Sequence, residues 1–328
     1  MKFLQTRTSR RIFSVLCAIA LASLAGQGMA GNYPTKAIRV IAPSPPGGGT
    51  DAMSRLLASR LTETAKWQVF VENLPGGGNN IGLRAGAKAA PDGQTLVMGE
   101  TSNLAVNPYL YKNLDFSAVD DLVPVALMGT GPLVLVVRTD SRFDSLASII
   151  EAGKKSDLFY ASSGSGTVGH LVAESLRDAT GVKLQHIPYK GAGPAMTDLL
   201  GGQVDLYFAS LTASLPHIAA GKLRPLAVSS DMRHGALPQV ATLAELGFPG
   251  LTFTAFYGVV APARTPEGVL DLLNKQINSA LDTDEVRAVF ARQGITPLLI
   301  SRTQFASFLA AERAKWSAVV KNTGAVVD

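Results

Sequence analysis

Cysteine is almost absent from this chain of 328 residues, which contains a single one, Cys17. It lies within the first thirty residues, whose pattern predicts a cleaved export signal, so the mature chain would contain no thiol. This excludes disulfide bonds, thiolate metal sites and a cysteine nucleophile. The stability of the mature chain must then come from hydrophobic packing. A length of about 300 residues is ample for one or two hydrophobic cores.

A long hydrophobic run is also missing. The apolar stretch from Ile12 to Ala25 is shorter than the roughly 20 residues that a membrane-spanning helix needs. It follows four basic residues and no acid, and small residues follow it at Gly28 and Ala30. Residues 1–30 are therefore predicted to be a signal peptide for export to the periplasm, by the Sec route or, because of Arg10 and Arg11, by the twin-arginine route.

An excess of positive or negative charge is absent once this signal is removed. The chain has 30 lysines and arginines against 25 acids, and four of the basic residues lie in residues 1–30, which leaves 26 against 25. Nucleic acid and anionic membrane surfaces are therefore not expected as partners. The histidines lack metal-binding spacing, so neither a metal nor a cofactor is expected; they are His170, His186, His217 and His234.

Runs rich in Val and Ile alternate with helical patterns, which predicts an α/β fold. One helix is expected over Thr50–Ala65, with Thr50 or Asp51 as its N-cap. Two separate strands are expected at Val123–Met128 and Leu133–Val137, because glycines and a proline interrupt the apolar run between them.

Two glycine-rich loops, Pro45–Asp51 and Leu74–Asn80, follow strand-like runs and lie 29 residues apart, the spacing of one β-α-β unit. Its parallel strands would bring both loops to the same carboxyl edge of the sheet, where open α/β folds bind ligands. Neither loop contains lysine or arginine. A small anion such as a carboxylate, held by backbone N–H groups at a helix start, is therefore expected rather than a triphosphate.

A third glycine loop spans Ser162–Gly169 and contains G-x-G-x-x-G. A dinucleotide site would need an acid about 20 residues further on, and residues 183–190 contain none. Its hydroxyls favour a hydrogen-bonding anion site. Ser165, His170 and Asp205 superficially form a hydrolase triad, but no G-x-S-x-G elbow is present, so an exported hydrolase is the weaker alternative.

Together these motifs resemble the extracytoplasmic solute receptors of tripartite tricarboxylate transporters, of the Bug or TctC type. The resemblance covers essentially the whole mature chain. It is carried by residues 33–41, the Pro46-Gly47-Gly48 loop with Asp51, residues 72–82, 107–111, 162–170, 188–191 and 198–205. One departure is Ser44, where family members usually carry an aromatic or similar residue, which bears on the size of the pocket.

The resemblance implies a periplasmic binding protein of type II, a Venus flytrap with two α/β lobes joined by two crossing strands. Residues 31–131 plus 256–328 would form lobe 1 and residues 132–255 lobe 2. The implied function is capture of a small carboxylate and its delivery to the membrane permease subunits, without catalysis, by a monomer. A receptor that signals to a membrane sensor is the alternative.

The family's binding mode implies main-chain N–H groups and hydroxyls, rather than an arginine, around the ligand carboxylate. His170 could donate to it or serve only in packing, and Asp205 could accept an ammonium or only cap local backbone. Mapped onto this chain, the expected ligand-binding residues are Gly47, Gly48, Thr50, Asp51, Asn79, Thr101, Ser102, Ser162, Ser163, Ser165, Thr167, His170, Asp205 and Ala209.

Overall fold

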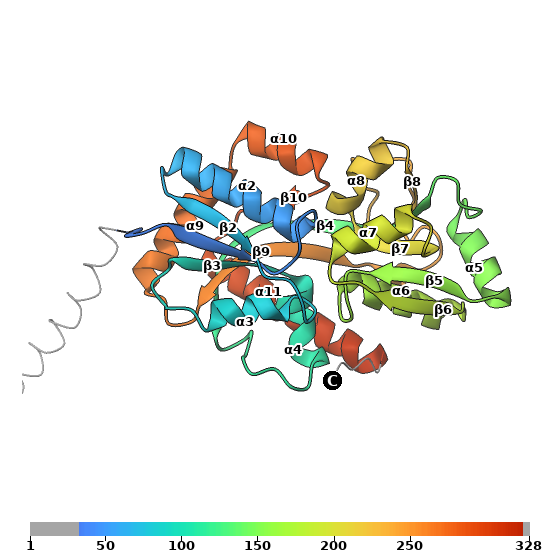
Figure 1. The fold of residues 1–328 in the computed structure, drawn as a ribbon, viewed down its shortest axis with the longest axis horizontal. Coiled ribbons are helices and arrows are strands. Elements are labelled where there is room, and N and C mark those ends of the chain that lie inside the picture. Colours follow the sequence, from blue (N-terminus) through green and yellow to red (C-terminus); the bar gives the residue numbers. More distant parts are fainter. Residues whose placement is uncertain (1–32, 324–328) are drawn as a thin grey trace, which may run out of the picture.

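Strands dominate the middle of the molecule and helices cover them, in a computed structural model that describes residues 33–323 (Figure 1). The signal peptide predicted for residues 1–30 lies outside the described residues. The strands are β1 (Ile38–Ala42), β2 (Val69–Asn73), β3 (Thr95–Glu100), β4 (Leu122–Arg138), β5 (Leu158–Ser162), β6 (Leu184–Pro188), β7 (Leu206–Ser210), β8 (Leu223–Val228), β9 (Thr254–Pro262) and β10 (Thr296–Pro297).

Helices alternate with these strands, as predicted for an α/β fold. A π-helical turn at Ser102–Val106 (η1) and a short 3-10 turn at Pro249–Leu251 (η2) add to them. The α-helices are α2 (Gly49–Thr64), α3 (Asn80–Ala87), α4 (Asn107–Leu110), α5 (Leu146–Lys155), α6 (Val168–Thr180), α7 (Ala192–Leu200), α8 (Leu211–Ala219), α9 (Glu267–Leu281), α10 (Asp284–Arg292) and α11 (Arg302–Thr323).

Two α/β lobes are built on one continuous strand order, β2-β1-β3-β9-β4-β7-β5-β6. In one lobe, β1 pairs in parallel with β2 and β3; in the other, β5 pairs in parallel with β6 and β7. The long strands β4 and β9 run between the lobes (Figure 1). The predicted Venus-flytrap architecture, two α/β lobes joined by two crossing strands, is confirmed.

Strand β4 is one element of 17 residues, so the prediction of two separate strands was wrong. It pairs with β9 from Leu122 to Pro132 and with β7 and β8 from Leu133 onward. Its glycines do not break the strand. A Cβ at Gly129 would lie 2.5 Å from the Thr296 carbonyl oxygen, so glycine allows the chain around β10 to approach.

Helix α2 agrees with the prediction to within one residue, but its cap differs. Its N-cap is Gly48, which offers no side chain to the helix. The Asp51 carboxylate instead accepts the backbone N–H of Gly47 and hydrogen bonds from Arg55 and Asn73. Asp51 therefore holds the glycine loop in place from inside the first turn.

Each lobe packs around its own apolar cluster, and a further cluster joins them.

Candidate functional site

The candidate site is a cavity where the carboxyl ends of six parallel strands meet, three from each lobe. β1 leads to Ser44 and Thr50, β2 leads to Asn79, and β3 ends at Glu100. From the other lobe come the loops after β5 and β6 and the end of β7. The residues lining the cavity are Ser44, Gly49, Thr50, Asn79, Glu100, Thr101, Ser102, Leu133, Ser163, Thr167, Val168, Gly169, Gly191, Ala192, Phe208, Ser210, Ala255 and Tyr257.

The position of the cavity follows from the topology of the parallel strands. In an α/β sheet the loops at the carboxyl ends of parallel strands emerge at one edge, and here the edges of the two lobes face each other. The crossing strands β4 and β9 contribute Leu133 and Tyr257 to the lining of the cavity. The cavity measures about 70 Å³, several times the space that one water needs. It suits a small molecule.

Helix N-termini surround the cavity. α2 and α3 begin beside it in one lobe, at Gly49 and Asn80, and α6 and α7 begin beside it in the other, at Val168 and Ala192. The first N–H groups of a helix have no partner within it and carry about half a positive charge. The four helix starts together make the cavity favourable to an anion.

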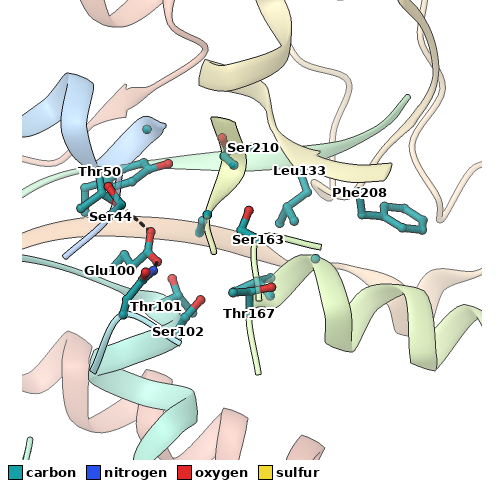
Figure 2. A pocket seen from close by; sticks show the side chains of 18 residues that line it. Ser44, Thr50, Glu100, Thr101, Ser102, Leu133, Ser163, Thr167, Phe208 and Ser210 are labelled. Carbon is teal, nitrogen blue, oxygen red and sulfur yellow. Dashed lines mark hydrogen bonds between the residues drawn. The ribbon is translucent and has the colours of Figure 1, made fainter. Parts of the chain in front are cut away.

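Hydroxyl groups supply most of the remaining polar lining, and Asn79 and Glu100 supply the rest (Figure 2). Among the hydroxyl residues, Ser44 is nearly fully buried and its Oγ has no hydrogen-bond partner among the described residues. A buried hydroxyl without a partner is costly, so it marks a place where a ligand atom is expected. No lysine, arginine or histidine of the described residues lines the cavity.

Among the residues that the structure describes, Glu100 is the one carboxyl group that lines the cavity. Thr50 donates to its Oε2 at 2.7 Å and Asn79 donates to its Oε1 at 2.5 Å. Burial raises the pKa of Glu100 above its usual range, while these two hydrogen bonds act in the opposite direction. Glu100 was not among the residues predicted from the sequence. Its place at the end of a buried strand, at the expected edge of the sheet, is the signal that could have identified it.

Two asparagines hold the second glycine loop in place. Asn107 donates to the Gly78 carbonyl at 2.8 Å, and Asn103 donates to the Asn79 carbonyl at 3.5 Å. Asn79 itself has a positive φ of 71°, in the left-handed region that asparagine tolerates better than most residues. The loop thereby directs the Asn79 side chain to Glu100.

Six of the residues predicted from the sequence line the cavity: Thr50, Asn79, Thr101, Ser102, Ser163 and Thr167. Others support the loops around it. Ser162 donates to the Gly164 carbonyl and lies 2.6 Å from His186, and Gly166 donates to His170 Nδ1. Ser165 accepts at its carbonyl from the Tyr111 hydroxyl. The predicted residues Ser162, Ser165 and His170 thus do not line the cavity. The same holds for Gly47, Gly48 and Asp51.

Two further predicted residues lie away from the cavity. Asp205 precedes β7 and its carboxylate accepts the Phe159 N–H at 2.8 Å, at the amino end of β5 and thus opposite the site. Ala209 packs into the core, whereas its neighbours Phe208 and Ser210 line the cavity, because successive side chains of a strand point to opposite faces. Asp205 therefore binds a backbone N–H of the neighbouring strand β5, and not the local backbone that was the alternative for it.

Neither a membrane span nor a metal cluster is found in the described part of the chain. No helix of residues 33–323 has the length and apolar character to cross a bilayer. Nowhere in the same range do three or more potential metal ligands come together. The Ser165, His170 and Asp205 side chains do not form a triad, since His170 Nδ1 accepts a backbone N–H and Asp205 lies at the other end of β5.

Comparison with known proteins agrees with this geometry. Protein BugT of Bordetella pertussis is 40% identical over 310 residues, 94% of this chain and 95% of BugT. The structure of Rpa4515 of R. palustris with adipate matches with a TM-score of 0.87 and 32% identity, covering 90% of this chain and 99% of that one.

A second solved structure, MatC (Rpa3494) from Rhodopseudomonas palustris with bound malate, matches with a TM-score of 0.83 and 29% identity, over 88% of this chain and 100% of that one. The sequence model described as the tripartite tricarboxylate transporter family receptor, TctC, matches residues 53–325. This chain therefore belongs to the TctC family of tripartite tricarboxylate transporter receptors.

Proposed function

We propose that this protein is a periplasmic receptor that binds one small carboxylate in the cavity between its lobes and delivers it to the membrane permease of a tripartite transporter. It acts as a monomer and catalyses no reaction. The observation that carries the proposal is the convergence of four helix N-termini on a cavity whose polar lining consists mostly of hydroxyl groups. Relatives bound to malate and adipate support it.

The lobes of this proposal follow the change of strand partners along β4. Residues 31–131 with 256–328 form lobe 1, and residues 132–255 form lobe 2. β4 leaves β9 after Pro132 and joins β7 at Leu133. The ligand contacts loops from both lobes and so favours the arrangement in which they close on it.

A thermal-melt screen of the exported protein tests the proposal. The protein is first unfolded and refolded to remove any bound molecule, and is then melted with single carboxylates of three to six carbons. An acid present at about 100 times its Kd adds roughly 2.7 kcal/mol of stability, which raises the Tm by several degrees. No shift with any acid of the panel would contradict carboxylate binding.

The variant Ser44→Ala tests the cavity itself. Its hydroxyl has no protein partner, so its removal should leave the Tm of the free protein unchanged. If it binds the carboxylate, the affinity for the best acid of the screen falls by roughly 0.5–1.5 kcal/mol in isothermal titration calorimetry. Ser307→Ala, on the exposed face of α11, is the matched control. An unchanged affinity in Ser44→Ala would show that the Ser44 hydroxyl does not bind the ligand.

A further inference from the structure

We infer that the ligand carries an ammonium group besides its carboxylate, and that Glu100 binds this ammonium. The ligand class is then small amino acids or other amino carboxylates, and plain mono- or dicarboxylates are disfavoured. This inference rests on the proposed function, because it concerns the same cavity and names the class of molecule bound there.

The carboxyl of Glu100 has room for further hydrogen bonds. A carboxylate accepts about four hydrogen bonds, and each oxygen of Glu100 receives one from the described residues, from Thr50 and from Asn79. The side chain lies at the rim of lobe 1 that borders the cavity, together with Thr101 and Ser102 (Figure 2). Its remaining lone pairs are available to a donor within the cavity.

No cation of the described residues compensates Glu100. The other titratable groups around it are Tyr207 and Tyr257, whose burial raises their pKa, to about 12 in Tyr207, so both are neutral. Asp51, next to Thr50 on α2, is paired with Arg55. A buried carboxyl with neutral neighbours costs free energy when it ionises, and an ammonium of the ligand would offset that cost.

The opposite wall of the cavity suits the carboxylate. There α6 and α7 begin, and Ser163 and Thr167 line the cavity beside these helix starts. A zwitterion fits both walls, with its carboxylate at α6 and α7 and its ammonium at Glu100. A dicarboxylate would instead bring a second negative charge against Glu100 where no cation balances it, and would have to take up a proton.

Calorimetric titration with matched acids tests this. The probes are β-alanine with propanoate and malonate, 4-aminobutanoate with butanoate and succinate, and L-glutamate with glutarate. The wild-type protein should bind at least one amino acid ten times more tightly than its partners without nitrogen. Glu100→Gln should lose at least tenfold in affinity for that amino acid and keep or gain affinity for the partners.

Two further variants serve as controls for Glu100→Gln. Glu100→Asp keeps the charge and should keep the preference for the amine, with weaker binding. Glu151→Gln, on the exposed face of α5, should bind like the wild type. Circular dichroism and melting of each free variant verify that it folds.

The outcomes separate this inference from the proposed function. If the wild type prefers a dicarboxylate or monocarboxylate and Glu100→Gln changes little, the inference is overturned while carboxylate binding stands, with Glu100 acting as a neutral donor. If no acid of the panel binds to either protein, carboxylate binding fails and the inference fails with it.

Discussion

Two histidine side chains beneath the loop after β5 stay neutral because the protein interior disfavours their charge. The rings of His170 and His186 stack with centroids 4.1 Å apart. Burial lowers the pKa of both to about 4; the charge of Arg177 lowers His170 further, and His170 lowers His186 further. The two rings support Ser162 and Gly166 and so position the hydroxyls of this loop.

This pair predicts that the protein loses stability in mild acid. An unfolded histidine has a pKa of about 6.5, so between pH 6.5 and about 4 the unfolded chain binds protons that the folded protein does not. The free energy of unfolding should therefore fall as the pH drops through this range, by at most about 1.4 kcal/mol per pH unit for each histidine. The partial exposure of His186 reduces its share.

Urea denaturation at several pH values between 7.5 and 4.5 measures this effect. His170→Gln should lower the dependence of the unfolding free energy on pH, because one of the two neutral histidines is gone. His217→Gln, in α8 and outside the stacked pair, is the control for the loss of a histidine as such. Equal slopes in all three proteins would show that the stacked pair does not titrate on unfolding.

At the scale of elements, the start of α6 depends on the close approach of its backbone to β7. A Cβ at Gly169 would overlap with the carbonyl oxygen of Phe208, so glycine alone fits this position. Gly169 is the last glycine of the G-x-G-x-x-G segment, where close packing of a helix on a strand requires it. The contact places the N-terminus of α6 at the cavity.

Gly169→Ala should therefore destabilise the protein by roughly 1–3 kcal/mol, because the added methyl group must displace backbone. It should also weaken binding of the best acid of the screen, since the first turn of α6 moves away from the cavity. Urea denaturation and calorimetry measure the two effects. Gly235→Ala is the control, because a Cβ there meets nothing within 4 Å. Equal stability of the two variants would refute the packing argument.

At the scale of the whole molecule, the two lobes contact each other around the cavity. The Tyr111 hydroxyl, at the end of α4, donates to the Ser165 carbonyl at 3.2 Å across the lobes. A Cβ at Gly191 would lie 2.5 Å from Pro45 Cδ, so the first glycine loop and the loop after β6 also touch. These contacts favour the arrangement in which the lobes enclose the cavity.

Tyr111→Phe should shift the protein toward a more open arrangement of its lobes. The variant loses one hydrogen bond between the lobes, worth roughly 0.5–1.5 kcal/mol. Part of the binding free energy of a ligand is then used to close the lobes. The radius of gyration of the ligand-free protein in small-angle X-ray scattering should increase, and the affinity for the best acid should fall. Tyr109→Phe, exposed on the same short helix, is the control. An unchanged radius would contradict the role of Tyr111.

Much of the fold and part of the site followed from local patterns. The two glycine loops that contain Thr50 and Asn79 were predicted because they follow strand-like runs, and parallel strands end at one edge. The two residues themselves were assigned from the resemblance to the family. The same rule would have placed Asp205 at the opposite edge, since it precedes its strand. Glu100 was missed because one acid at a strand end looks like a surface residue until the surrounding loops are in place.

The sequence by itself determined the α/β alternation, the glycine loops and the family, because these depend on residue periodicity and on motifs of neighbouring residues. Only the tertiary structure decided which side chains share the cavity. Ser44, Glu100, Ser210 and Tyr257 come from four different strands or loops, and no spacing along the chain relates them. Their convergence results from the pairing of β4 and β9, which turns the two sheet edges toward each other.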